Sequence, residues 1–221
     1  MRTPVIAALG DSITAGSALV HGETNWTDLL AERFSTKVVN AGIGGNTAGE
    51  GLARMERDAL AASPDIVLIE FGMNDHVICD AAGHPRTPLP AFRDALRTMI
   101  ARCRDAGACP VLVTPNRIIE EYYYERHPKE WYLPLGGAQA QLALYCETIR
   151  ETAADCAVPL ADVHLLCGRY ELPSLLRTPG QGNFRDGVHP YGAGIVLYAD
   201  VIGRVLEHEV LPGLMRSETD A

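Results

Sequence analysis

The sequence lacks a long apolar run, an excess of basic residues and closely paired cysteines. Its longest uninterrupted apolar stretches are short ones such as residues 5–9, whereas a membrane span needs roughly 18 residues. We therefore expect no membrane insertion. The chain carries 19 basic and 28 acidic side chains, a net charge of −9, which argues against nucleic-acid binding. None of the 6 cysteines forms a CxxC pair, so we expect no structural zinc site.

The first residues also lack the pattern of a secretory signal. Residues 1–4 lead directly into an apolar run of five residues that ends before Gly10, whereas a signal has a basic segment followed by a longer apolar one. We therefore expect a cytoplasmic chain with free, mostly buried thiols.

The length and composition are those of one globular unit. The chain has 221 residues, of which 47% are hydrophobic and 21% charged, an ordinary globular balance. At about 150 residues per domain, this length favours a single domain, which we place at residues 1–215. Residues 216–221 are polar, and we expect a disordered tail there.

Short apolar runs alternate with longer amphipathic segments along the chain. The runs expected to form strands are residues 5–9, 37–40, 65–71, 110–114 and 158–163. The segments expected to form helices are residues 27–34, 48–62, 89–106, 138–157 and 193–211. This alternation predicts an α/β fold, a five-stranded parallel sheet with helices on both faces.

Two long segments break the alternation. Residues 165–184 are rich in proline and glycine, and residues 116–137 contain three consecutive tyrosines, Tyr122 to Tyr124. Loops of this length are usually functional or disordered. For the tyrosine-rich segment we favour packing or a contact in a homo-oligomer over substrate contact.

Side chains suited to catalysis follow the expected strands. Asp11 and Ser12 follow the first strand, a glycine-rich turn follows the second, and Asn74 follows the third. Asp186 and His189 lie near the end of the chain. In an open parallel sheet, ligands bind at the carboxyl ends of the strands. A hydroxyl, backbone donors, an amide, an imidazole and a carboxylate are the groups required for nucleophilic acyl transfer.

These blocks resemble those of the SGNH hydrolase superfamily, the GDSL-type esterases and lipases. The matching blocks are Gly10-Asp11-Ser12, Asn40-Ala41-Gly42-Ile43-Gly44-Gly45-Asn46-Thr47, Gly72-Met73-Asn74-Asp75 and Asp186-Gly187-Val188-His189-Pro190. The resemblance extends from Gly10 to His189 in the family's order. It implies a flavodoxin-like three-layer α/β/α sandwich, in agreement with the alternation.

The resemblance also assigns roles to individual residues. It makes Ser12 the nucleophile, His189 the general base, and Asp186 the residue that orients the imidazole. It places the backbone N–H groups of Ser12 and Gly45 and the side chain of Asn74 in the oxyanion hole. Gly42 and Gly44 lie beside Gly45, which we chose because it directly precedes the Asn-Thr pair.

Each role has a physical reason. A serine hydroxyl needs a base to remove its proton during attack, and histidine titrates close to the working pH. A carboxylate on one imidazole nitrogen fixes the tautomer that leaves the other free. The Gly-x-Ser-x-Gly turn of the α/β-hydrolases is absent, which separates this chain from that fold.

Structural interpretations compete with these assignments. Ser12 could cap the helix that follows it, and we expect Asp75 to be mainly structural. Asp186 and His189 could instead bind a metal with help from His76 and Asp80, although their spacing forms no compact ligand motif. As candidates for the substrate pocket we take residues that flank the main blocks: Asp11, Met73, His76 and Val188.

We therefore predict a serine-dependent hydrolase of carboxylic esters that needs no metal or cofactor. Its expected partner is a small-molecule ester with a small or medium acyl group. An O-acetyl group on a carbohydrate is suggested by analogy with family members. The first alternative is an acyl-CoA thioesterase or lysophospholipase that uses the same site. The second is a binding protein without catalysis, which would have no need for all four of Ser12, Asn74, Asp186 and His189.

Overall fold

The computed structural model describes residues 3–178 and 186–214. The expected tail at 216–221 lies outside these residues, and a single domain over residues 1–215 stays a prediction. Within the described ranges, no helix is long and apolar enough to cross a membrane.

Five parallel strands form one sheet in the order β2-β1-β3-β4-β5, which confirms the predicted five-stranded α/β fold. The strands are β1 Ile6–Gly10, β2 Val38–Gly42, β3 Ile66–Glu70, β4 Cys109–Val113 and β5 Leu160–Ala161. This is the flavodoxin-like order, in which ligands bind where the direction of winding reverses, between β1 and β3.

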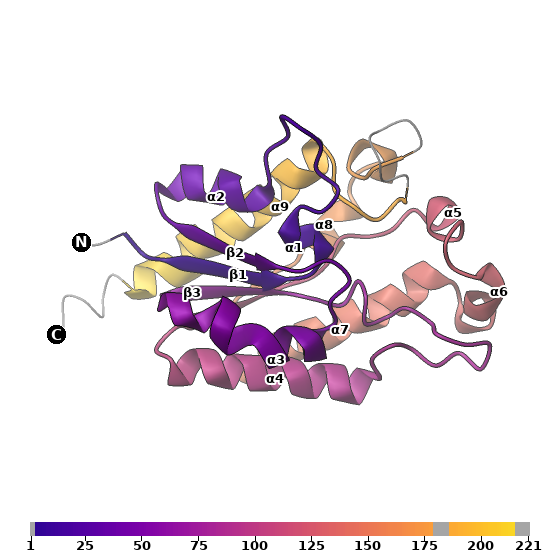
Figure 1. The fold of residues 1–221 in the computed structure, drawn as a ribbon, viewed down its shortest axis with the longest axis horizontal. Coiled ribbons are helices and arrows are strands. Elements are labelled where there is room, and N and C mark those ends of the chain that lie inside the picture. The colour runs from indigo at the N-terminus through magenta and orange to yellow at the C-terminus, as the bar shows by residue number, and fades with distance from the viewer. Residues whose placement is uncertain (1–2, 179–185, 215–221) are drawn as a thin grey trace.

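Helices cover both faces of the sheet (Figure 1). The longer helices are α2 Trp26–Phe34, α3 Ala48–Asp58, α4 Leu89–Asp105, α7 Ala138–Cys156 and α9 Ala193–Val205. The shorter helices are α1 Ser12–Ala15, α5 Glu120–Tyr123, α6 Lys129–Tyr132 and α8 Val163–Cys167. Helices α2 and α9 lie together on one face, whereas α3, α4 and α7 lie on the other.

Alternating side chains of the strands build two cores. In β1, Ile6 and Ala8 pack with α2 and α9, while Ala7 and Leu9 pack with α3 and α4. All four side chains are buried, as expected for a strand covered on both faces. Trp26, at the start of α2, is also fully buried, so it is an anchor of the first core.

The structure refines several predicted boundaries. The run at 158–163 forms only the two paired residues of β5, because Pro159 has no N–H to donate and Asp162 already caps α8. The helix expected over 48–62 ends as α3 at Asp58 and continues as a single 3-10 turn. The helix expected over 193–211 changes to π-helical turns at Leu206.

The tyrosine-rich segment is ordered by short helices rather than by a long periodic one. It contains α5, α6 and a 3-10 turn over Leu133–Leu135. Tyr123 and Tyr132 are buried, with their hydroxyl oxygens 3.1 Å apart. Packing, the first of the favoured interpretations, is therefore confirmed for Tyr132. Tyr123 is packed in the same way but also borders the cleft of the candidate site.

Candidate active site

Ser12 lies where β1 ends and α1 begins, at the carboxyl edge of the sheet (Figure 1). Asp11 caps α1, because its Oδ1 accepts a hydrogen bond of 2.9 Å from the Ile13 N–H. The competing interpretation of Ser12 as the helix cap is therefore wrong. The preceding Gly10 allows close packing, since a Cβ there would collide with the side chain of Thr14.

The hydroxyl of Ser12 is in hydrogen-bond contact with His189. Ser12 Oγ lies 2.9 Å from His189 Nε2, and His189 Nδ1 lies 2.6 Å from Asp186 Oδ2. The structure thus brings Ser12, His189 and Asp186 into one chain of hydrogen bonds although 174 residues separate Ser12 from Asp186 along the sequence. This geometry permits the serine proton to pass to the imidazole.

The loop that carries Asp186 and His189 is held by backbone bonds. Gly187 N–H donates to Arg177 O at 3.0 Å, and Arg177 N–H donates to His189 O at 2.9 Å. Gly187 has a φ of 63° and packs against Ile119 so closely that a Cβ would come within 2.8 Å of it. Glycine is the residue that meets both conditions without strain.

Asp186 is held as a carboxylate. Burial alone would raise its pKa, but the hydrogen bond and charge of His189, together with the backbone N–H groups of Val188 and His189, lower the pKa of Asp186 to about 2. The carboxylate is therefore present at any ordinary pH and can fix the tautomer of the imidazole.

The glycine-rich turn and Asn74 approach Ser12 from the ends of β2 and β3. Gly44 and Gly45 border the same cleft as Ser12 and Asn74. Gly45 has a φ of 78°, in the left-handed region that favours glycine. Within the described residues, the N–H groups of Ser12 and Gly45 donate no hydrogen bond, so both remain available to an oxyanion.

The amide of Asn74 is already engaged in the free protein. Its Nδ2 donates to Asp11 Oδ2 at 3.0 Å and to the backbone oxygen of Asn46 at 3.1 Å. These two bonds use both of its N–H groups. Asn74 can therefore donate to an oxyanion only if one of these bonds is released or shared.

Behind Asn74 lie two buried carboxyl groups. Asp11 and Glu70 are both fully buried, and Thr14 Oγ1 donates to Glu70 Oε2 at 3.0 Å. Burial is the main cause that raises the pKa of both groups, and the charge of Asp11 raises that of Glu70 further. Asp11 supports Asn74 directly, because it accepts a hydrogen bond from its amide.

Two arginines, which sequence reasoning missed, hold the turn that contains Gly45. Arg86 donates to Gly45 O at 2.8 Å, and Arg54 donates to Gly10 O at 2.8 Å and to Asn46 Oδ1 at 2.7 Å. Arg54 thereby joins the end of β1 to the turn that follows β2. Neither residue belongs to a motif, and their helical or loop positions gave no signal of this role.

Asp75 has the structural role expected of it. Its carboxylate accepts hydrogen bonds from the backbone N–H of Ala48, at 3.0 Å, and of Gly72, at 3.1 Å. It therefore joins the start of α3 to the end of β3. Burial raises the pKa of Asp75 to about 6.

The site opens into a cleft of about 400 Å³. The cleft is lined by Ser12, Ser17, Gly44, Gly45, Met73, Asn74, Val77, Tyr123, Arg126, His127, Val188 and His189. Of the candidate pocket residues, Met73 and Val188 border the cleft. Asp11 and His76 are fully buried behind it.

His76 does not line the cleft but lies behind Tyr123. It stacks on Tyr123 with ring centroids 5.6 Å apart, and Tyr123 lines the cleft. Burial lowers the pKa of His76 to about 4, so the imidazole is neutral at pH 7.

The donors of the competing metal interpretation are not assembled. Among residues 3–178 and 186–214, no three His, Cys, Asp or Glu side chains are grouped to hold a metal ion. Asp80 instead pairs with His84, at 2.8 Å from its Nδ1, on an exposed loop. Asp186 and His189 are directed at each other and at Ser12.

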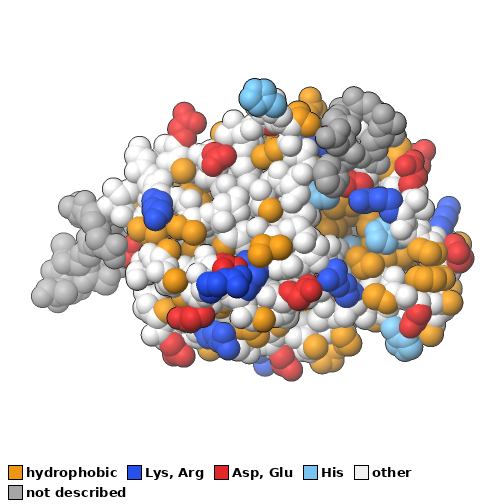
Figure 2. Space-filling model, in the orientation of Figure 1, with side chains coloured by type: hydrophobic (Ala, Val, Ile, Leu, Met, Phe, Trp, Pro, Cys, Tyr) orange, Lys and Arg blue, Asp and Glu red, His pale blue; other side chains and the backbone are white. Residues whose placement is uncertain are grey.

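Charge is dispersed over the face of the molecule shown in Figure 2, where acidic and basic side chains alternate. On this face there is no broad basic surface of the kind that binds nucleic-acid backbones.

Comparisons with known proteins agree with the geometry. The GDSL-like Lipase/Acylhydrolase family matches residues 8–195. The uncharacterized lipoprotein YqeF of Bacillus subtilis (strain 168) is 34% identical over 169 residues, 71% of this chain and 69% of its own length. An arylesterase of Vibrio mimicus is 33% identical over 135 residues, 56% of this chain and 64% of its own.

The fold is shared with a solved enzyme. The crystal structure of the lipase/acylhydrolase from Enterococcus faecalis superposes with a TM-score of 0.73 and 25% identity, and covers 92% of this chain and 95% of that chain. Because YqeF is named a lipoprotein, the cytoplasmic location of this chain stays a prediction. The family match extends over more than four fifths of the 221 residues, and the chain therefore belongs to the GDSL-like lipase/acylhydrolase family of carboxylic ester hydrolases.

Proposed function

We propose that this protein hydrolyses small or medium acyl esters through a covalent acyl-enzyme on Ser12. The observation that carries the proposal is the chain of hydrogen bonds from Asp186 through His189 to Ser12, at 2.6 and 2.9 Å. The named arylesterase relative supports the same class of reaction.

The first half of the reaction transfers the acyl group. Ser12 Oγ attacks the ester carbonyl carbon while His189 Nε2 takes the hydroxyl proton, and the carbonyl oxygen becomes an oxyanion. The backbone N–H groups of Ser12 and Gly45 and the amide of Asn74 bind that charge. The bond to the alcohol oxygen then breaks, and His189 returns the proton to the departing alcohol.

The second half uses water. His189 takes a proton from a water molecule as the water attacks the acyl-enzyme. When the second tetrahedral intermediate collapses, the bond between the acyl carbon and Ser12 Oγ breaks, His189 returns the proton to Ser12 Oγ, and the acid leaves. Asp186 stays ionised throughout, because its pKa is held at about 2, and it stabilises each imidazolium that forms.

The size of the cleft favours substrates with short acyl chains. Its volume of about 400 Å³ lies toward the low end of the range of about 300–1,000 Å³ typical of small-molecule sites. Apolar side chains such as Met73 and Val188 line the cleft, and they suit an acetyl or a short alkyl group. An O-acetyl group on a carbohydrate remains our specific candidate. A long acyl chain, as in a lysophospholipid, would need more apolar surface.

The test is covalent labelling combined with turnover. A fluorophosphonate should label the wild type, and Ser12→Ala should abolish labelling and lower the hydrolysis of 4-nitrophenyl acetate by at least about 10⁴-fold. Ser17→Ala is the matched control, because Ser17 also lines the cleft, and it should still be labelled. Most of the activity remaining in Ser12→Ala would overturn the proposal.

Two further arms separate the competing functions. Hydrolysis should survive exhaustive treatment with EDTA, and loss that a divalent ion restores would favour a metal-dependent reaction. When esters and acyl-CoA thioesters with 2 to 16 acyl carbons are compared, kcat/KM should be highest for the esters with the shortest acyl chains. A maximum on long thioesters would favour the thioesterase alternative.

A further inference from the structure

One cationic side chain, Arg126, lies in the cleft beside the residues of the proposed mechanism. Its Nη2 is 3.1 Å from Asp186 Oδ2, and its side chain is 48% exposed, against 2% for Asp186. The same oxygen of Asp186 lies 2.6 Å from His189 Nδ1. Arg126 thus touches the buried carboxylate with one edge of its guanidinium and presents the remainder to the cleft.

The backbone that carries Arg126 is firmly anchored. Its N–H donates to Tyr123 O at 3.2 Å, and Tyr123 is itself held by stacking on His127, with ring centroids 4.1 Å apart, and on His76. The Ile119 N–H donates to Gly187 O at 2.8 Å, which joins this segment to the loop of Asp186. The backbone of Arg126 is therefore fixed in place, and this keeps the guanidinium beside the site.

The electrostatic surroundings favour an anion. None of the described residues that line the cleft is acidic, and Arg126 is the permanent cation among them. Burial and then the charge of Arg126 lower the pKa of the neighbouring His127, which favours the neutral form of that imidazole. A guanidinium has five N–H donors in a planar fork that matches a carboxylate, and one contact with Asp186 leaves most of them available.

We propose that Arg126 is a specificity residue that binds a carboxylate group of the substrate, so that the preferred substrates are small acyl esters with a carboxylate in the acyl or the alcohol part. This inference rests on the proposed ester hydrolysis at Ser12. Oxyanion donors stabilise any ester, whereas Arg126 distinguishes an anionic ester from a neutral one of the same shape.

The contact with Asp186 couples binding to catalysis. In the free protein Arg126 and His189 share one oxygen of Asp186. A substrate carboxylate that attracts the guanidinium weakens the contact between Arg126 and Asp186. More of the negative charge of Asp186 is then available to the imidazolium that forms as Ser12 attacks. A neutral ester offers no such attraction.

The experiment compares esters that differ only in charge. For the alcohol part, the pair is 4-acetoxybenzoate and its methyl ester. For the acyl part, it is the 4-nitrophenyl monoester of adipic acid and the corresponding methyl diester. For each pair, the ratio of kcat/KM for the anionic to the neutral ester is measured in wild type and variant. Dividing the two ratios cancels both the intrinsic reactivity of the esters and any general effect of the variant through Asp186.

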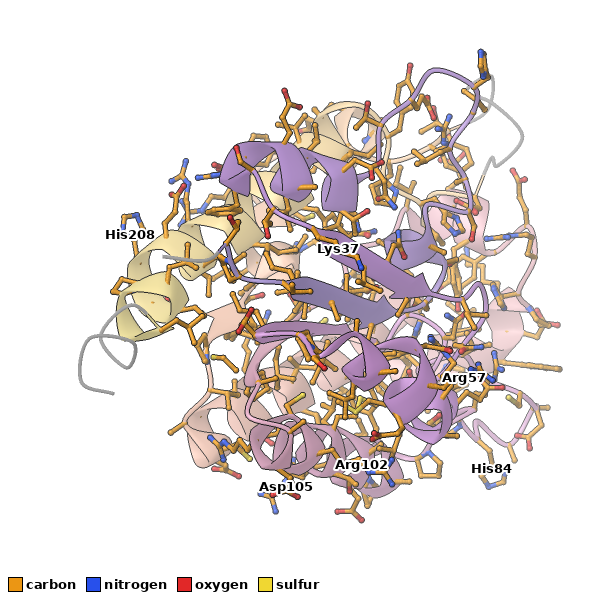
Figure 3. All side chains as sticks on the ribbon, turned by 60° about the vertical axis from the view of Figure 1, so that its left-hand side comes forward. Lys37, Arg57, His84, Arg102, Asp105 and His208 are labelled. Carbon is orange, nitrogen blue, oxygen red and sulfur yellow. The ribbon has the colours of Figure 1, made fainter. Side chains whose placement is uncertain are left out.

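Arg126→Gln should lower the ratio by about tenfold or more in at least one pair, as expected for the loss of a charge-assisted hydrogen bond. The affected pair shows which part of the substrate carries the carboxylate. Arg126→Lys, which keeps the charge but not the fork, should restore part of the ratio. Arg102→Gln is the matched control, since it removes one positive charge from the exposed side of α4 (Figure 3), and its ratios should equal those of the wild type.

An unchanged ratio in both pairs for Arg126→Gln would overturn the inference, and so would an equal change in Arg102→Gln. Equal losses on anionic and neutral esters would make Arg126 a support for Asp186 rather than a specificity residue. Failure of the proposed function is distinguishable, because Ser12→Ala would then keep its activity toward all four esters.

Discussion

The sharpest test of the proposed oxyanion hole is Asn74→Ala. A donor that acts only on the transition state is worth about 2.7–4 kcal/mol. In the free protein, however, both N–H groups of Asn74 are bonded, to Asp11 Oδ2 and to Asn46 O. The bond to the neutral carbonyl of Asn46 is the easier one to release, at a net cost of about 1 kcal/mol. The difference, about 1.7–3 kcal/mol, predicts a 20- to 150-fold loss of kcat.

The variant should also be less stable, because Asp11 loses a donor in a buried position. An unsatisfied buried acceptor costs about 1–3 kcal/mol, so a lower melting temperature alone does not distinguish a structural role from a catalytic one. The assay is therefore kcat per active site, titrated with a fluorophosphonate, on 4-nitrophenyl acetate. KM should stay within a few-fold, since the oxyanion forms only after binding.

Asn25→Ala is the matched control. Its amide donates to Thr14 O at 2.9 Å, and Asn25 does not line the cleft, so the variant loses a buried amide bond and should keep its kcat per active site. A near-normal kcat in Asn74→Ala, with a melting temperature lowered as in the control, would remove Asn74 from the oxyanion hole.

Two further predictions concern the ionisable groups. His189→Ala should lower kcat by about 10⁶-fold and Asp186→Asn by about 10⁴-fold, measured per active site on 4-nitrophenyl acetate; a His189→Ala variant that keeps most of its kcat would identify another base. As the pH rises from about 5 to 9, the melting temperature of Glu70→Gln should increase relative to that of the wild type. Burial raises the pKa of Glu70. The wild type therefore has the stability that comes from neutral Glu70 below the ordinary carboxyl pKa of about 4.3, and loses it as the pH rises through the raised pKa. A difference in melting temperature that does not change with pH would contradict this.

The sequence predicted the fold well where one kind of pattern dominates. Buried strands such as Ile66–Glu70 are continuous apolar runs, and long helices such as Leu89–Asp105 have a clear periodicity, so both were located within one or two residues. Short elements were missed because tertiary contacts stabilise them. Helix α5 has only four residues, too few for a periodic signal, and it is held by the packing of Tyr123.

The site shows the same difference between residues that a sequence pattern reveals and residues whose role depends on tertiary contacts. Ser12, Asn74, Asp186 and His189 were located because their chemistry and their position after strands coincide with a family pattern. Arg54, Arg86 and Arg126 were missed, because an isolated arginine on a helix or loop is most often a solvated surface residue. Their partners are backbone oxygens and a carboxylate from distant segments, and such pairings depend on the assembled fold.

The sheet order explains why the site forms at this place. β2 follows β1 in sequence but lies on its other side, so β1 and β3 become neighbours, and Gly10 pairs with Glu70 across them. Ser12 and Asn74 therefore follow adjacent strand ends, and Glu70 is the last residue of β3. A carboxyl group at that position is buried by the strands themselves, which raises its pKa and favours its neutral form beside the carboxylate of Asp11. Asp11 can then accept the hydrogen bond of Asn74 without repulsion from a second negative charge.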